Sequence, residues 1–203
     1  MPAKDVDTFY PKNRLQWRRW LERNHSKKQS IWLVFYKKNA KTPTLSWSEA
    51  VDEALCFGWI DGTKKSLGND KSIQYFSRRK TNSVWSRINK GKVKRLIDEG
   101  LMTAAGFESI ATAKQNGSWV ILDEVEELTI PKDLSKAFRS QAGSKAFFTG
   151  LSKSAKKMIL QWIVLAKRPE TRQKSIDEVA ALAAKKSGCA GTGAHDESRT
   201  SGI

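Results

Sequence analysis

An acid and an arginine stand on two short runs that can become neighbouring strands. Asp61 lies in the run W-I-D-G, and Arg79 ends the run Y-F-S-R-R. Ser86, a little further on, can cap a helix, and a helix N-terminus beside an arginine is a natural anion pocket. Arg79 can therefore hold an anion there, or it can pair with Asp61 across a hairpin as a purely structural contact.

The same two residues also allow an enzymatic interpretation. Asp61 would act as acid or base and Arg79 would stabilise developing charge, and a raised pKa of the carboxyl would favour this over a salt bridge. The sequence has no Walker loop, no G-x-G-x-x-G and no G-x-S-x-G. We therefore predict no catalytic residues, and the enzyme stays an alternative.

The cysteine and histidine pattern predicts neither a metal nor a cofactor. Cys56 and Cys189 lack C-x-x-C spacing, and His25 and His195 are far apart in the chain. Cys56 stands in a run that resembles a packed helix, where a cysteine is usually inert.

Residues 78–95 form a strongly basic segment that no acid interrupts. On a helix over 86–98, Arg87, Lys90 and Lys94 share one face and leave the apolar positions to the other. Such a helix is either a nucleic-acid footprint, which gives affinity rather than sequence readout, or a solvated surface. The residues that would contact phosphates are Arg78, Lys80, Arg87, Lys90 and Lys94.

The composition favours an anionic partner without naming it. The chain has 203 residues, of which 39% are hydrophobic, and a net charge of +16. Such a charge suits nucleic acid, phosphorylated metabolites or an anionic membrane surface. The sequence has two cysteines, no apolar signal region and no apolar run long enough to span a membrane. We expect a cytoplasmic protein on these grounds.

The hydrophobic pattern of the N-terminal part predicts both helices and strands. The run S-W-S-E at Ser46 is a capping box, apolar residues then recur at helical spacing, and Gly58 stands where a helix should end. The last two strands should form a hairpin. The expected helices are 12–24, one between Ser46 and Gly58, 86–99 and 104–116, and the expected strands are 30–38, 59–66 and 72–77.

The C-terminal part is expected to be helical after an acidic segment, D-E-V-E-E, that marks a linker or an exposed crossing. Ser152 should cap one long helix, and Pro169 should begin the next. The Gly/Ser-rich tail from Ser187 is expected to be disordered. The expected fold is α+β, with a domain that has a small sheet and flanking helices over 8–122, a linker over 123–131, a small all-helical module over 132–186 and the tail over 187–203.

Several blocks of the sequence together resemble one bacterial family. In the N-terminal part they read A-L-C-F-G-W-I-D-G, Y-F-S-R-R-K-T-N-S-V-W-S-R-I-N and R-L-I-D-E-G-L-M. In the C-terminal part they read P-K-D-L-S-K-A-F, A-F-F-T-G-L-S-K-S-A-K-K and Q-W-I-V-L-A-K-R-P-E-T-R. Across 8–186 the chain resembles the YdeI-like, OmpD-associated (OmdA) family. The resemblance implies an α+β domain joined to a helical module, an association with tolerance of bacteriocins and antimicrobial peptides, and no established reaction.

The resemblance also implies where a site would lie. Arg78 stands where relatives commonly have a proline, so we expect a less rigid turn and a larger basic patch here. The family's recurring positions fall on Trp59, Asp61, Gly62, Arg79, Trp85, Ser86 and Asn89.

The leading hypothesis is a ligand-binding or stress-tolerance protein that holds a small anionic ligand between these two runs. Asp61 would orient Arg79, and Arg79 would hold the anion together with the helix end at Ser86. Trp59 and Trp85 would form the walls of the pocket.

Overall fold

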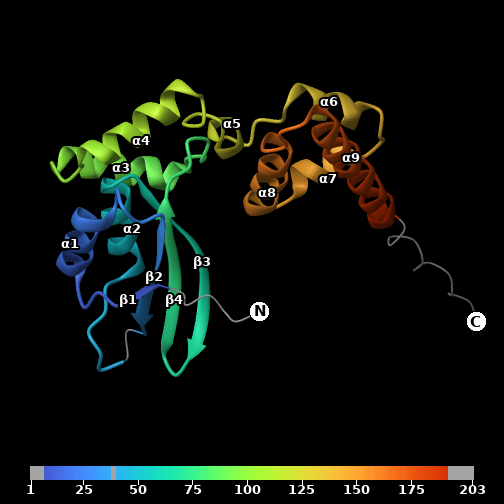
Figure 1. The fold of residues 1–203 in the computed structure, drawn as a ribbon. Helices are drawn as coiled ribbons and strands as arrows, with labels where there is room; N and C mark the ends of the chain where they lie inside the picture. Colours follow the sequence, from blue (N-terminus) through green and yellow to red (C-terminus); the bar gives the residue numbers. More distant parts are fainter. Residues whose placement is uncertain (1–6, 38–39, 192–203) are drawn as a thin grey trace, which may run out of the picture. The chain divides into compact units, whose positions relative to one another are not determined.

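The computed structural model describes residues 7–37 and 40–191. The chain forms two compact units, which meet in sequence at Val120 and Ile121. The first unit combines a small sheet with helices, and the described part of the second contains helices and no strand (Figure 1). The expected α+β fold with a helical C-terminal part is confirmed.

Four strands form one sheet in the order β1-β2-β4-β3. β1 runs parallel to β2, and the other neighbours are antiparallel. β3 and β4 form the predicted hairpin, whose turn contains Asn69 and Asp70 with positive φ. The strands are β1 (Thr8–Phe9), β2 (Ser30–Tyr36), β3 (Trp59–Gly68) and β4 (Lys71–Arg78).

The helices of the first unit begin at the caps that the sequence indicates. Ser46 accepts a hydrogen bond from the backbone N–H of Glu49, whose carboxylate accepts one from the N–H of Ser46, so the predicted capping box is confirmed. Ser86 accepts from the N–H of Asn89 at the start of α3. The helices are α1 (Arg14–Asn24), α2 (Trp47–Cys56), α3 (Arg87–Asp98) and α4 (Ala104–Gln115).

Gly58 ends α2 as the sequence predicts, with a φ of +69°. A Cβ atom at this position would lie 2.9 Å from the backbone oxygen of Ala105. Glycine therefore serves twice here, because it adopts the left-handed conformation without strain and lets α4 approach the turn closely. The end of the hairpin is thereby placed beside α4.

The core of the first unit lies between the sheet and helices α1 and α2. Trp17, Trp59 and Phe76 are fully buried there. The indoles of Trp17 and Trp59 keep hydrogen-bond partners, since the N–H of Trp17 donates to the Ala50 oxygen at 3.0 Å and that of Trp59 to the His25 oxygen at 3.2 Å.

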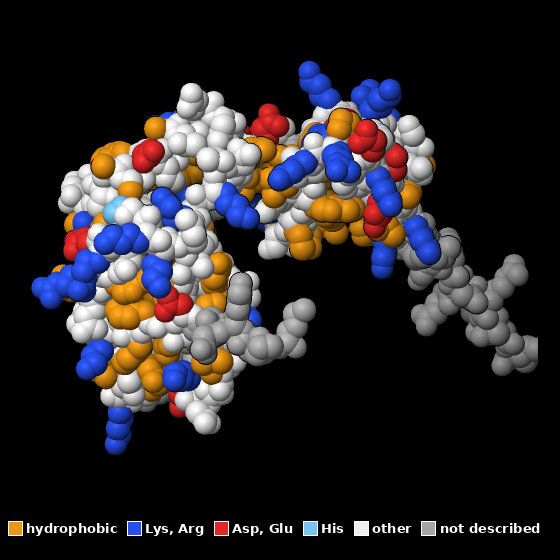
Figure 2. Space-filling model, in the orientation of Figure 1, with side chains coloured by type: hydrophobic (Ala, Val, Ile, Leu, Met, Phe, Trp, Pro, Cys, Tyr) orange, Lys and Arg blue, Asp and Glu red, His pale blue; other side chains and the backbone are white. Residues whose placement is uncertain are grey.

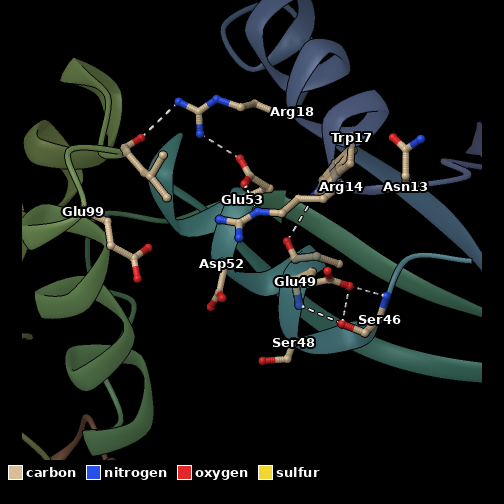
Figure 3. A network of polar contacts seen from close by, with 12 residues as sticks. Asn13, Arg14, Trp17, Arg18, Ser46, Ser48, Glu49, Asp52, Glu53 and Glu99 are labelled. Atoms are coloured by element: carbon tan, nitrogen blue, oxygen red, sulfur yellow. Dashed lines mark hydrogen bonds and ion pairs between the residues drawn. The ribbon is translucent and has the colours of Figure 1, made fainter.

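Two consecutive acids of α2, Asp52 and Glu53, are also buried. Glu53 accepts from Nε of Arg14 at 2.5 Å and from Nη1 of Arg18 at 2.8 Å, and both arginines belong to α1 (Figure 3). Arg18 also donates to the Leu101 oxygen beyond α3, at 3.1 Å. The acid thus ties α1 to α2 with hydrogen bonds that offset the cost of burying it.

Asp52 ties α2 to α3 in the same manner. Its carboxylate lies 2.6 Å from Nζ of Lys92 and 2.5 Å from Nη2 of Arg95. Val93 and Leu96 of α3 are buried, as the amphipathic pattern predicts. Lys92 and Arg95 belong to the basic segment 78–95, which contains no acid of its own. An acid from another helix therefore neutralises them.

The second unit is held by apolar side chains and one arginine. Ser152 caps α8 by accepting from the N–H of Ala155, and α9 begins at Pro169, as predicted. Arg172 of α9 binds Asp133 of α6 at 2.7 Å. The helices are α5 (Asp123–Glu126), α6 (Lys132–Arg139), α7 (Ser144–Gly150), α8 (Lys153–Val164) and α9 (Pro169–Gly191). The buried apolar residues include Leu134, Phe138, Phe148, Leu160, Ile163, Ile176 and Val179.

Two segments of this unit differ from the sequence prediction. The acidic segment expected as a linker contains α5, because Leu122 and Val125 are buried and Lys157 of α8 binds Glu126 at 2.5 Å. The tail was expected to be disordered from Ser187, but α9 continues to Gly191. A helix that is already formed gains one hydrogen bond for each residue that it adds, and this favours its extension into the tail. The remainder of that tail, 192–203, lies outside the described residues.

Candidate functional site

A cleft of about 880 Å³ opens in the first unit where the hairpin ends beside α4. Arg79 and Trp85 line it after β4, and Tyr75 lines it from within β4. His25 contributes from the end of α1, and Glu108 from α4. This volume lies in the range of small-molecule sites in proteins.

Arg79 is one of the basic residues that line this cleft. Its guanidinium carbon lies 3.6 Å from the centroid of the Trp85 ring, and Nη1 donates to the Val84 oxygen at 3.2 Å. Nε is buried and has no hydrogen-bond partner among the described residues. Burial lowers the pKa of Arg79 to about 10, and the charge of Asp61 opposes this shift. Arg79 thus remains a cation at neutral pH, with one N–H donor left over.

Asp61 does not pair with Arg79, so this structural alternative is wrong. In the hairpin Asp61 lies opposite Phe76, on the face that carries the core. Its carboxylate accepts from the indole N–H of Trp47 on α2 at 3.0 Å and from Nε2 of Gln74 at 3.4 Å. Arg79 comes three residues after Phe76, and because strand side chains alternate, it points to the other face.

The structure brings together Arg79 and Trp85 from the predicted set but not the other residues. Trp59 lies in the core and is 0% exposed, so it does not form a wall of the cleft. Ser86 and Asn89 make the cap of α3 and are not part of the cleft lining. Asp61 lies on the opposite face of the sheet, so the joint Asp61/Arg79 centre of the enzymatic alternative is not formed.

Sequence reasoning missed the contributions of α1 and α4 to the cleft. Nδ1 of His25 lies 2.9 Å from the Leu21 oxygen, and because that oxygen can only accept, Nδ1 is the donor in this contact. Glu108 and Ser109 come from one turn of α4. The one local signal of the contribution from α4 was Gly58, whose missing side chain allows α4 to pack against the turn.

The basic residues predicted for nucleic acid do not form a single stripe. Arg78 and Lys80 lie at the cleft, whereas Arg87 and Lys94 are exposed on α3. Nζ of Lys90 lies 5.3 Å from the ring centroid of Trp119. On the face shown in Figure 2, Lys and Arg side chains are spread over the surface of both units.

The second unit has a hollow of about 950 Å³ between α8 and α9, lined by Met158, Trp162 and Leu165 among others. Its lining combines these apolar side chains with Lys157, Lys167 and Arg168. The buried side-chain donors and acceptors that lack a partner within the described residues are Arg14 Nη2, Arg79 Nε and Ser118 Oγ. None of them faces this hollow, so we regard the Arg79 cleft as the candidate site.

The described part of the chain bears on two further features, a metal site and a membrane-spanning helix. It contains no group of three His, Cys, Asp or Glu side chains suited to holding a metal ion. It also contains no helix whose length and apolarity would carry it across a membrane.

Comparison with known families matches each unit to a different description. Residues 127–186, in the helical unit, match the family "Bacteriocin-protection, YdeI or OmpD-Associated" (OmdA). The helical unit therefore contains a domain of the YdeI or OmpD-associated family. Residues 9–109 match a domain of unknown function, DUF8412, so the OmdA helices here follow a distinct N-terminal domain that contains the cleft. Curated proteins and solved structures gave no match.

Proposed function

We propose that this OmdA-family chain is a non-enzymatic, cytoplasmic binding protein that holds a small anionic ligand in the Arg79 cleft. The observation that carries the proposal is the state of Arg79. Its guanidinium is stacked on the Trp85 ring, and its buried Nε has no partner among the described residues. An unpaired buried donor is costly, and a ligand oxygen that accepts from it removes that cost.

The charge balance of the cleft supports an anion rather than a cation. Arg78, Arg79 and Lys80 lie along it, and Glu108 is the acid that faces them. Basic side chains therefore exceed acidic ones, and the field favours a carboxylate or phosphate group. The hydroxyl groups of Ser77, Ser109 and Thr112 line the same cleft and can orient the rest of a polar ligand.

The two alternatives from the sequence have weaker support. An enzyme using Asp61 and Arg79 would need both groups at one reacting atom, and they occupy opposite faces of the sheet. A nucleic-acid site on α3 would use Arg87 and Lys94, which are exposed. Asp52 of α2 binds Lys92 and Arg95, however, and this reduces the positive charge of the helix.

A thermal-shift screen tests the anion site. Inorganic phosphate, pyrophosphate, citrate and benzoate are the probes, because they sample the anion's charge and shape. At 100 times its Kd a ligand should stabilise the protein by about 2.7 kcal/mol. Arg79→Gln should abolish the shift, and Arg87→Gln, which removes the same charge from exposed α3, should preserve it. The proposal is wrong if none of the probes stabilises the protein or if both variants respond equally.

We also propose that ligand binding at this cleft underlies a stress-tolerance role, as the description of the OmdA family suggests. Strains that express the wild-type chain or Arg79→Gln at equal levels would be challenged with a bacteriocin. Better survival with the wild type is expected. Equal survival would show that ligand binding at the cleft does not underlie stress tolerance. The proposal that the cleft binds an anion would then still be decided by the thermal-shift screen.

A further inference from the structure

The face of the sheet turned away from α1 and α2 carries aromatic side chains. Trp32 and Tyr36 of β2 point to it, and so does Tyr75 of β4, because Trp32 lies opposite Tyr75 in the pairing of the two strands. The ring centroids of Trp32 and Tyr75 are 5.2 Å apart. In the first unit α1 and α2 cover the opposite face (Figure 1), so these rings form an aromatic surface outside the core.

Lysines lie near two of these rings. Nζ of Lys65 lies 4.9 Å from the centroid of the Trp32 ring, and Nζ of Lys71 lies 5.8 Å from that of Tyr36. Asp70, at the tip of the hairpin, is paired with Lys37 at 2.7 Å. The face therefore combines flat apolar rings with positive charge.

The aromatic face continues into the Arg79 cleft. Tyr75 belongs to both, because its ring packs against Trp32 and also lines the cleft. A Cβ atom at Gly62 would lie 3.3 Å from the Tyr75 ring, so the glycine leaves room beside that ring. An extended ligand can follow the rings along the strands toward Arg79 without meeting a large side chain at Gly62.

We propose that this face binds single-stranded nucleic acid. Bases would stack on Trp32, Tyr36 and Tyr75, and phosphates would lie near Lys65 and Lys71. Stacking on aromatic side chains beside a positive track is how proteins bind single strands with little sequence preference, and a four-stranded sheet can present rings for two or three bases. The proposal goes beyond the small-anion site and does not need Arg79.

The chemistry of the face favours a single strand over other anionic partners. A duplex hides the flat sides of its bases, so the rings would have nothing to stack on. A lipid surface is best met by protruding apolar side chains, whereas Trp32, Tyr36 and Tyr75 are only partly exposed. A single strand offers both a flat aromatic surface and a charge for each lysine.

Fluorescence anisotropy with labelled oligo-dT and oligo-U of about twelve nucleotides tests the proposal, with a duplex of equal length for comparison. Lys65→Glu should weaken single-strand binding by tenfold or more. Lys64→Glu is the matched control, because Lys64 lies opposite Gln74 on the α2 side and carries the same charge. Trp32→Leu should weaken binding roughly 5- to 150-fold, as loss of one stacked base does.

The dependence on salt gives a second readout. For each lost phosphate contact, the slope of log affinity against log salt should decrease in magnitude by about 0.7. Lys65→Glu should show this change and Lys64→Glu should not, while Arg79→Gln, which abolishes the small-anion site, should retain most of the single-strand affinity.

Any of four results would overturn the proposal. The first is that neither oligonucleotide binds at about 50 mM salt, and the second is that Lys65→Glu and Lys64→Glu weaken binding equally. The third is that the duplex binds as tightly as the single strand, and the fourth is that the protein binds phosphatidylglycerol vesicles but no oligonucleotide. The lysine variants change exposed side chains, so the test does not depend on whether Trp32→Leu folds.

Discussion

Glu53 of α2 and Arg18 of α1 form an ion pair whose acid is almost completely buried. Oε2 of Glu53 lies 2.8 Å from Nη1 of Arg18, and the acid's side chain is 2% exposed. Arg14 binds the other oxygen of the same carboxylate. The link between the two helices thus depends on one carboxylate with two arginines.

Glu53→Gln should lower the free energy of unfolding by about 3 kcal/mol, because it leaves two partly buried cations without their anion. Urea denaturation measures this. Glu22→Gln is the control, since Glu22 pairs with Arg18 at 3.5 Å while 51% exposed. It should cost less than about 0.5 kcal/mol. Equal losses of unfolding free energy in the two variants would show that the burial of Glu53 does not strengthen its ion pairs.

Cys56 should make the protein less stable at alkaline pH. Burial raises the pKa of its thiol to about 11, and the nearby charge of Glu53 adds to the shift. Above about pH 9 the unfolded chain releases this proton and the folded chain keeps it, so stability falls with rising pH until about pH 11. The expected loss is of the order of 2 kcal/mol. Denaturation at several pH values should show a shallower decline for Cys56→Ala than for the wild type.

The same thiol should resist alkylation in the folded protein. At pH 8 very little of a group with a pKa of about 11 is thiolate, which is the reactive form. In a Cys189→Ser background, iodoacetamide should modify Cys56 only after urea unfolds the chain. Rapid modification of the native protein would mean that the site is open to solvent.

Arg172 should stabilise the second unit against unfolding more at neutral pH than at acidic pH. Its hydrogen bonds lower the pKa of Asp133, so their contribution is present above about pH 4 and is lost as the pH falls through the folded value. Both side chains are partly exposed, and the contribution should be less than about 1 kcal/mol. Arg172→Gln should lose stability at pH 7 and show a smaller acid dependence. Lys174→Gln, an exposed change on the same helix, should behave as the wild type.

Substituting Gly58 and Gly100 in turn distinguishes the cost of backbone strain from the cost of a steric clash. Both have positive φ, at +69° and +67°. A Cβ at Gly58 would meet Ala105, whereas no atom lies within 4 Å of one at Gly100. Gly100→Ala should cost about 1 kcal/mol from conformation alone, and Gly58→Ala should cost at least 1 kcal/mol more. Thermal denaturation measures the difference, and similar costs would mean that α4 can shift without penalty.

The elements of the fold were predictable where their signals are local. The capping box of Ser46 and Glu49 operates within four residues, and the stop at Gly58 depends on one backbone angle. The hairpin followed from two apolar runs around a turn. Such features depend on residues near one another in sequence, so their patterns predicted them correctly.

The candidate site was only partly predictable. Arg79 and Trp85 are six residues apart and meet after β4, so their proximity was within reach of the sequence. The separation of Asp61 from Arg79 was not, because a shift of one position along a strand turns a side chain to the other face. Glu108 reaches the cleft only because α4 docks against Gly58.

The sequence by itself determined most helices and strands, several of their caps and stops, the family of the helical unit, and the positive charge that favours anions. Tertiary structure alone decided which charges remain available. Asp52 and Glu53 look like ordinary helix-surface acids in the sequence, yet packing buries them against cations from α1 and α3. The same packing buries Nε of Arg79 without a partner among the described side chains. Burial and pairing depend on contacts between distant residues, and no local pattern encodes them.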